Sequence, residues 1–269
     1  MAYNYRQINF EVMSDTEHCY KTMPVLICAV ENSIANQYMV SEEDNIDQHI
    51  SDTKDTRYIV SGKRSFEAAK DYKGKKVAVL NYANNLSIGG APFFAGAQEE
   101  SLCRCSTLLP CLQAMKESFY QEHHHLYITN QMDFMGNDDL IYTPDVVIFK
   151  SDERTDPVYP RMMNHEEWFK VNVITCAAPQ MQITKAYPKN YESAIRARIK
   201  KILDVAAKEN NEVVILGAWG CGAFKNPIEI VARTFIDLLK NYDFKIVEFA
   251  LATRNDVQSS AFARALRNQ

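Results

Sequence analysis

Apolar residues recur with two different spacings along the chain, and the two spacings indicate strands that alternate with helices. Short apolar runs bounded by Lys-Gly, Asn or Pro are typical of strands, and apolar residues at every third or fourth position are typical of helices. Strands are predicted within residues 56–60, 75–83, 141–152, 168–179, 211–224 and 244–253. Helices are predicted within residues 65–72, 98–120, 190–210, 226–240 and 256–266.

This order of elements predicts an α/β fold with three layers, in which a sheet lies between two layers of helices. Strands as continuously apolar as Val213–Leu216 occur in sheets that are covered on both faces. Residues 1–55 have a different pattern, which is polar and helical and ends in the acidic segment "SEEDNIDQHISD". We therefore expect a helical N-terminal extension at residues 1–55 and a main domain at residues 56–269.

Composition narrows the classes of function. The 269 residues are 46% hydrophobic and 24% charged with a net charge of −4, and without a long basic tract we expect no binding to duplex nucleic acid. The first residues do not resemble a signal peptide, and no apolar run approaches the roughly 18 residues of a membrane span. Seven cysteines without a disulfide framework indicate a reduced, cytoplasmic protein that has no contact with a membrane.

Two glycine-containing loops follow predicted strands. The first contains Gly89 and Gly90, and the second is "GAWGCGAF" at residues 217–224. Ligands of open α/β sheets bind at the carboxyl ends of the strands, and backbone N–H groups in such loops can hold phosphate without any lysine. An alternative for the second loop is a tight turn between strand and helix, with Trp219 and Phe224 in the core.

The first loop leads into Gln98-Glu99-Glu100 at the start of a predicted helix. Adjacent helical residues point about 100° apart, so the two carboxylates cannot do the same work. An acidic first turn also stabilises any helix through the helix dipole, which is the alternative without a functional role. Asn84 and Asn85 lie just before this loop. Ordinary turn chemistry is the explanation for them that needs no functional role.

Other reactive side chains favour structural explanations. Cys176 lies in a predicted strand without a local histidine signature, which indicates a buried small residue. Cys103 and Cys105 are two positions apart on a predicted helix and do not face each other, so packing is favoured over metal binding. The stretch Glu122–His125, "EHHH", is interpreted as a solvated loop. No metal site is predicted.

Four segments in order resemble the microbial-type poly(ADP-ribose) glycohydrolases, which are enzymes with the macrodomain fold. The segments are "VLNYANNLSIGGAPFFAGAQEE", "IYTPDVVIFKSD", "VNVITCAAPQ" and "LGAWGCGAFKNP". The resemblance runs from about Tyr58 to Leu251, whereas residues 1–55 match the N-terminal extension of the family only loosely. It implies a macrodomain-like mixed sheet in a catalytic domain at residues 56–269, with no cofactor and with ADP-ribosylated proteins or poly(ADP-ribose) as partners.

The family signature is three glycines, six to eight residues, and then Gln-Glu-Glu. Here Ala91 takes the place of the third glycine, and six residues separate it from Gln98. If this position requires a positive φ, a Cβ costs about 1 kcal/mol or more.

The resemblance also implies roles for the site residues. Glu100 would be the catalytic acid/base, and Glu99 would hold the ribose hydroxyls. Because a general acid must carry a proton, we expect burial, or repulsion from the neighbouring carboxylate, to favour the protonated form of Glu100. Asn84 would orient the terminal ribose, and Phe224 would pack against the ribose of the bound nucleotide. The expected substrate-binding residues are Asn84, Gly89, Gly90, Gln98, Gly217, Gly220, Cys221, Gly222, Ala223 and Phe224.

Three functions remain open from the sequence. The first is a glycohydrolase that cleaves the O-glycosidic ribose–ribose bonds of poly(ADP-ribose), or a related ADP-ribosyl linkage, to release ADP-ribose. The second is a non-catalytic macrodomain that reads ADP-ribose, which Ala91 and the bulky Phe93 and Phe94 favour. The alternative for Phe93 and Phe94 is a lid against the distal ribose or adenine. The third is a different nucleotide-handling enzyme on a similar fold, because a fold does not determine a function.

Overall fold

The computed structural model describes residues 4–46, 55–152, 160–252 and 256–267. Its described residues form one mixed sheet with the strand order β1-β4-β5-β3-β6-β7-β2. Strand β4 runs antiparallel to both of its neighbours, and all other neighbouring strands are parallel. The strands are β1 (Tyr38–Val40), β2 (Arg57–Ser61), β3 (Val77–Ala83), β4 (Leu140–Ile148), β5 (Phe169–Ala177), β6 (Val213–Leu216) and β7 (Ile246–Ala250).

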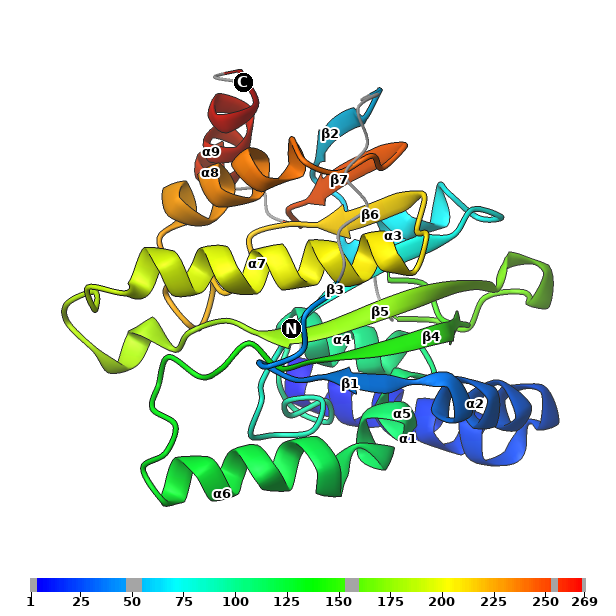
Figure 1. The fold of residues 1–269 in the computed structure, drawn as a ribbon. Helices are drawn as coiled ribbons and strands as arrows, with labels where there is room; N and C mark the ends of the chain where they lie inside the picture. The colour runs from blue at the N-terminus through cyan, green and yellow to red at the C-terminus, as the bar shows by residue number, and fades with distance from the viewer. Residues whose placement is uncertain (1–3, 47–54, 153–159, 253–255, 268–269) are drawn as a thin grey trace.

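Helices cover both faces of this sheet, as Figure 1 shows. Helices α7, α8 and α9 share a buried core with one face, and α1 to α5 share a second core with the other. This arrangement confirms the predicted three-layer α/β fold. The helices are α1 (Tyr5–Thr22), α2 (Pro24–Asn36), α3 (Ser65–Lys70), α4 (Gln98–Cys105), α5 (Leu108–Ala114), α6 (Glu122–Ile128), α7 (Tyr191–Lys208), α8 (Ile228–Leu239) and α9 (Asp256–Arg267).

Strand β3 shows why its sequence is apolar at nearly every position. Val77 and Val79 belong to the core on one face, whereas Ala78 and Leu80 belong to the core on the other. Successive side chains of a strand point to opposite faces, so a strand that is covered on both sides needs apolar residues throughout. Strand β3 lies between β5 and β6, so its carboxyl end is in the middle of the sheet.

The sequence predicts a helical N-terminal segment, but the described part of this segment also contains a strand. Tyr38–Val40 forms β1, an edge strand that pairs antiparallel with Leu140–Tyr142 of β4. Helix α1 packs against α4, and α2 packs against β4 and α5. These contacts join the segment closely to the rest of the fold, and a domain boundary near residue 55 stays a prediction. Residues 47–52, half of the acidic stretch, lie outside the described residues.

The single helix predicted for residues 98–120 is also interrupted. Ser106 adopts an extended conformation and forms an antiparallel bridge with Ile148. The N–H of Thr107 donates to the carbonyl of Val147 at 3.0 Å. This pairing ends α4 at Cys105 and fixes that helix to the end of β4. Among the described residues, no helix combines the length and the apolar character that a membrane crossing requires.

Candidate active site

Helix α4 begins immediately after the first glycine loop and places Glu99 and Glu100 in its first turn, where both side chains are buried. Glu99 is held at both carboxyl oxygens. The side-chain amide of Asn81 donates to Oε1 at 3.2 Å, and the backbone N–H of Asn84 donates to Oε2 at 2.9 Å. Glu99 is therefore fixed against the end of β3.

Burial raises the pKa of Glu99 to about 8. Repulsion from Glu100 acts in the same direction, and the hydrogen bonds from Asn84 and Asn81 oppose the shift without cancelling it. Glu99 consequently favours its protonated form at neutral pH.

Glu100 is held at one oxygen only. The N–H of Ala91 donates to Oε1 at 3.2 Å, whereas Oε2 is buried and has no hydrogen-bond partner in the part of the chain that the structure describes. An unpaired buried carboxyl oxygen is costly unless a ligand or water satisfies it. Among the oxygens of Glu99 and Glu100, Oε2 of Glu100 is therefore the one whose hydrogen-bonding capacity the described residues leave unused.

Gly90 makes room for this pair of carboxyl groups. Its φ is +68°, and a Cβ built there would overlap Oε1 of Glu100 and lie 3.3 Å from Oε2 of Glu99. Gly89 has a φ of +66°, and a Cβ on it would meet Leu109 at 2.8 Å. Both glycines are thus required by the protein's own structure, whether or not a phosphate approaches them.

Ala91 does not strain the loop. The described non-glycine residues with positive φ are Asn130, Asp145, Asn210, Lys225 and Ala252, and Ala91 is not among them. Its N–H reaches Glu100, and its carbonyl accepts from the N–H groups of Phe94 and Ala95 at 2.9 and 2.8 Å. The cost expected for a Cβ at this position is therefore absent.

Gln98, which the sequence placed among the substrate-binding residues, makes hydrogen bonds that hold α4 against β3 and α3. Its amide nitrogen donates to Ser65 Oγ at 3.0 Å and to the carbonyl of Leu80 at 2.8 Å. Its carbonyl oxygen accepts from the N–H of Tyr82 at 2.9 Å. Both amide hydrogens are engaged within the protein, so Gln98 fixes the start of α4 to β3.

The two asparagines after β3 combine turn chemistry with support of the site. The side-chain oxygen of Asn84 accepts from the N–H groups of Leu86 and Ser87 at 2.8 and 3.1 Å, which is an Asx turn. Its own N–H holds Glu99. Asn85 is buried, and its amide points to Met132 Sδ at 4.0 Å.

The second glycine loop, residues 217–224, follows β6 and is shaped by close contacts. A Cβ on Gly217 would overlap the hydroxyl of Tyr82, and one on Gly220, where φ is +70°, would lie 2.5 Å from the amide nitrogen of Asn226. The Asn226 amide donates to the carbonyls of Pro179 and Gly220 at 2.8 and 3.0 Å, and its oxygen accepts from Tyr191 at 2.7 Å.

The outer part of this loop is open. A Cβ on Gly222 would meet nothing within 4 Å, and Gly222 and Ala223 are exposed. Phe224 is half-buried, whereas Trp219 is fully buried and donates its indole N–H to the carbonyl of Cys176 at 2.9 Å. Trp219 thus belongs to the core, as the structural alternative supposed. Burial raises the pKa of the half-exposed Cys221 thiol to about 12.

The sequence did not predict two residues of β3 that shape the site, Asn81 and Tyr82. Asn81, inside the apolar strand β3, holds Glu99 and also donates to Thr175 at 3.2 Å. The hydroxyl of Tyr82 is buried beside Gly217 and has no hydrogen-bond partner among the described residues, and burial raises its pKa. A polar residue within a continuously apolar strand was the available signal for Asn81.

Several cysteines and one histidine of α6 are buried within the fold. All seven cysteines are free, and Cys103, Cys105 and Cys176 are fully buried, as predicted. The interpretation of "EHHH" as a solvated loop is wrong, because these residues begin α6 and His123 is buried. Within the described ranges, no group of three or more His, Cys, Asp or Glu side chains could hold a metal ion.

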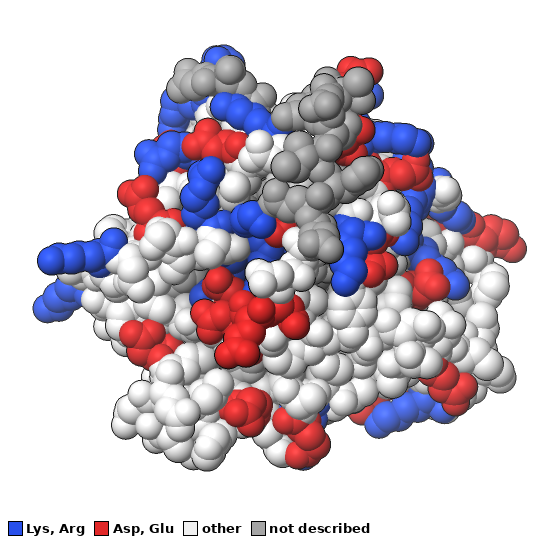
Figure 2. Space-filling view, in the orientation of Figure 1, with Lys and Arg blue, Asp and Glu red and all other residues white. Residues whose placement is uncertain are grey.

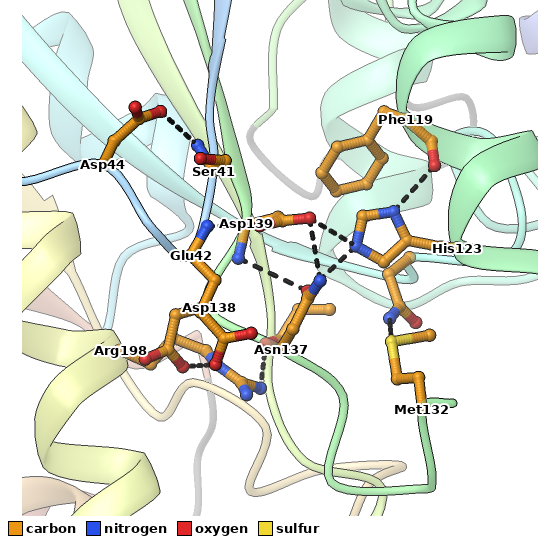
Figure 3. A network of polar contacts seen from close by, with 12 residues as sticks. Ser41, Glu42, Asp44, Phe119, His123, Met132, Asn137, Asp138, Asp139 and Arg198 are labelled. Carbon is orange, nitrogen blue, oxygen red and sulfur yellow. Dashed lines mark hydrogen bonds and ion pairs between the residues drawn. The ribbon is translucent and has the colours of Figure 1, made fainter. Parts of the chain in front are cut away.

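His123 belongs to a polar network that anchors the segment between α6 and β4 (Figure 3). Its Nδ1 lies 2.7 Å from the carbonyl of Phe119, and its Nε2 lies 2.9 Å from Asn137 Oδ1 and 3.3 Å from Asp139 Oδ2. Asp139 in turn accepts from the N–H of Glu42 at 2.6 Å. The buried side chain satisfies its polar atoms within the fold, which explains its position without a catalytic role.

Charge is distributed unevenly on the face shown in Figure 2. Acidic side chains gather at its centre, lysines and arginines lie mostly above them, and the lower part, over α6, is largely uncharged. No broad basic surface covers this face. Backbone N–H groups, such as those of the glycine loops, can hold phosphate without a basic surface.

The comparisons with known proteins agree with this geometry. The sequence model of the microbial-type PARG catalytic domain, where PARG stands for poly(ADP-ribose) glycohydrolase, matches residues 13–151, more than half of the chain. The chain belongs to this family. The match includes the first glycine loop, Glu99 and Glu100. No curated protein is similar enough to the chain to match it.

Solved structures of bacterial PARG proteins resemble the whole fold. PARG from Thermomonospora curvata is 28% identical, with a TM-score of 0.82 over 96% of this chain and 98% of that chain. The same protein bound to the inhibitor ADP-HPD gives a TM-score of 0.79 at 28% identity over 95% and 98%. PARG from Deinococcus radiodurans in complex with ADP-ribose gives a TM-score of 0.77 at 29% identity over 89% and 97%. The macrodomain-like fold expected from the resemblance is thereby confirmed.

Proposed function

We propose that this PARG-family chain hydrolyses the O-glycosidic ribose–ribose bonds of poly(ADP-ribose) and releases ADP-ribose, with Glu100 as general acid and base. The family and the bacterial PARG structures support the activity. The observation that supports the role of Glu100 is its buried Oε2, which has no partner in the described part of the chain. Both oxygens of the neighbouring Glu99 already accept hydrogen bonds.

The reaction begins with proton transfer from Oε2 of Glu100 to the glycosidic oxygen. The bond between that oxygen and C1 of the terminal ribose breaks, and positive charge develops on the ribose ring. A water molecule then attacks C1, and Glu100, now ionised, takes up the proton that this water loses. The carboxyl group is thereby protonated again. Free ADP-ribose and a polymer shortened by one unit result.

Glu99 has a supporting role in this proposal. Asn81 and Asn84 fix its carboxyl group, which can still exchange hydrogen bonds with the hydroxyl groups of a ribose. Its raised pKa keeps a proton on Glu99 at neutral pH. The protonated form also avoids placing two negative charges side by side before the substrate binds.

The second glycine loop would hold the diphosphate. Its outer residues Gly222 and Ala223 are exposed, and Phe224 lies beside them with part of its ring uncovered. A diphosphate can approach backbone N–H groups closely where a Cβ is absent. We accordingly keep Gly217, Gly220, Cys221, Gly222, Ala223 and Phe224 as proposed substrate-binding residues, together with Asn84, Gly89 and Gly90. For Gln98, the hydrogen bonds favour a positioning role.

A reader of ADP-ribose without turnover is the second candidate. The same loops would support binding, and only the carboxyl pair distinguishes an enzyme from a reader. Two buried carboxyl groups side by side, one with a pKa of about 8, destabilise a fold that merely binds a ligand. This cost favours the enzyme.

The deciding experiment compares the purified protein with its Glu100→Gln variant on poly(ADP-ribosyl)ated protein, with free ADP-ribose measured by mass spectrometry. Release by the wild type alone supports the proposal. We expect the variant to keep its ADP-ribose affinity within about tenfold, or 1.4 kcal/mol. No release from either protein, with ADP-ribose still bound, would leave the reader as the better function.

ADP-ribosylated proteins are the partners that this activity implies. We also propose a cytoplasmic location, because seven free cysteines suit a reducing compartment.

A further inference from the structure

Helix α1 and the first glycine loop together form a cluster of three phenylalanines, Phe10, Phe93 and Phe94, which we call the aromatic cluster. The ring centre of Phe10 lies 5.8 Å from that of Phe93 and 6.2 Å from that of Phe94. The rings of Phe10 and Phe94 are stacked, with planes 28° apart. Residues more than 80 positions apart in the sequence thus build one surface.

Two members of the aromatic cluster are exposed to solvent. Phe10 is 44% exposed and Phe94 is 52% exposed, although packing alone would bury such rings more completely. The guanidinium of Arg6 lies 5.9 Å from the ring centre of Phe94 and places a positive charge at this surface. Exposed aromatic faces beside an arginine are features of sites that bind single-stranded nucleotides.

Buried donors hold the loop in this position from its inner side. The amide of Asn9 donates to the carbonyls of Phe94 and Ala95 at 3.2 and 3.0 Å. The guanidinium of the fully buried Arg104 donates to the carbonyls of Pro92 and Ala95 at 2.7 Å each. The loop backbone is therefore fixed on one side, and the Phe94 ring remains exposed.

The aromatic cluster is also connected directly to the catalytic carboxyl group. The N–H of Ala91 donates to Glu100, and the carbonyl of Ala91 accepts from the N–H of Phe94. Phe94 thus belongs to the same short turn that binds Glu100. The turn that carries Phe94 therefore lies next to the Glu100 carboxyl group.

We propose that the aromatic cluster and Arg6 bind the ADP-ribose unit whose ribose carries the scissile oxygen and which stays with the shortened polymer. Its adenine stacks on Phe94, and its diphosphate lies near Arg6. This inference rests on the proposed polymer substrate. In that polymer the scissile oxygen belongs to the ribose that carries the adenine of the next unit, so a purine lies immediately beyond the bond. Purines stack on aromatic side chains regardless of sequence, and each stacked base contributes a measurable part of the affinity.

The test measures binding, so that it does not depend on turnover. In the Glu100→Gln protein, calorimetry gives the affinities for ADP-ribose and for a two-unit oligomer of ADP-ribose. Adding Phe94→Ala should weaken binding of the oligomer about tenfold and leave the affinity for ADP-ribose within about twofold. Phe94→Trp should keep the oligomer affinity, because tryptophan also offers an aromatic face. Val25→Ala, at a 48% exposed position on α2, serves as the control and should change neither affinity.

Equal weakening of both ligands by Phe94→Ala would show that the aromatic cluster only shapes the loop, and would overturn the inference. An unchanged oligomer affinity would overturn it as well. If the Glu100→Gln protein bound neither ligand, the proposed function and this inference would fall together. Binding of both ligands with selective loss of the oligomer would support the subsite even for a protein without turnover, so the two proposals can fail separately.

Discussion

The carboxyl group of Glu100 occupies the space that Gly90 leaves empty. A Cβ built on Gly90 would lie 2.9 Å from Cδ of Glu100, a distance that real Cβ atoms do not tolerate. The positive φ of Gly90 adds a second reason for glycine at this position. The glycine loop therefore positions the proposed catalytic acid directly, in addition to any contact with phosphate.

Gly90→Ala should accordingly abolish hydrolysis of poly(ADP-ribose), because the new methyl group displaces the Glu100 carboxyl group. The reduction in kcat should be at least about a hundredfold, as expected for a misplaced catalytic group. Gly96→Ala is the matched control in the same loop, since a Cβ there would meet nothing within 4 Å. Equal activity of the two variants would contradict the arrangement described for Gly90 and Glu100.

Ala91→Gly restores the third glycine of the family signature, and we expect it not to raise kcat. The backbone at Ala91 does not require glycine, so the substitution mainly increases the freedom of the unfolded chain. The free energy of unfolding should fall by roughly 0.5–1 kcal/mol. Urea denaturation and steady-state kinetics check the two expectations. A large gain in kcat would show that Ala91 impairs the enzyme.

The raised pKa of Glu99 predicts that stability depends on pH. The folded protein keeps the Glu99 proton up to about pH 8, whereas the unfolded chain releases it near the ordinary value of 4.5. Unfolding therefore releases a proton between these values, and the free energy of unfolding falls as pH rises through this window. Glu99→Gln removes this contribution.

Urea denaturation of both proteins at pH 5 and pH 8 tests this expectation. Glu99→Gln also loses one of the two hydrogen bonds that the Glu99 side chain accepts. The informative quantity is therefore the change in the free energy of unfolding between the two pH values. From pH 5 to pH 8 the wild type should lose roughly 2 kcal/mol or more relative to the variant. Parallel pH profiles would show that Glu99 titrates normally.

The sequence predicted much of the fold because its strands are covered on both faces and therefore apolar throughout. It did not predict β1, since three residues are too few to establish a periodicity and pairing with β4 decides their conformation. The break in the helix after Cys105 arises from the bridge between Ser106 and Ile148, residues that are distant in sequence. Both errors reflect tertiary contacts that outweigh local preference.

The candidate site shows the same division. The Gln-Glu-Glu motif and the two glycine loops are local patterns, so their place after β3 and β6 could be predicted. The function of Gln98 could not, because its partners Ser65 and Leu80 come from two other elements. Asn81 was overlooked since a single amide in an apolar strand has many structural explanations.

Substitutions at two glycines in the second loop should separate ligand binding from folding. Gly220→Val should reduce both stability and ADP-ribose affinity, because the side chain would meet Ala178 and Asn226 within the protein. Gly222→Val should weaken ADP-ribose binding at least about tenfold while the free energy of unfolding changes by less than about 1 kcal/mol, since the space around Gly222 is open. Calorimetry with ADP-ribose and thermal unfolding measure the two effects. Unchanged affinity in Gly222→Val would remove this loop from the proposed site.

Asn9 connects the N-terminal helix to catalysis and provides the last prediction. Asn9→Asp preserves the shape of the side chain but directs oxygen toward the carbonyls of Phe94 and Ala95, where the amide now donates. The loop should move away from α1, and kcat should fall by about tenfold or more, since the carbonyl of Phe94 loses its donor and that of Ala95 keeps only Arg104.

Glu17→Gln, on an exposed part of the same helix, is the control for a general effect on α1. It removes a surface ion pair with Lys21, which contributes roughly 0–1 kcal/mol, and should leave kcat unchanged. The affinity for ADP-ribose in Asn9→Asp should change less than kcat, because the second glycine loop stays intact. A loss of affinity equal to the loss of kcat would indicate that α1 supports the fold as a whole and does not specifically position the glutamate loop.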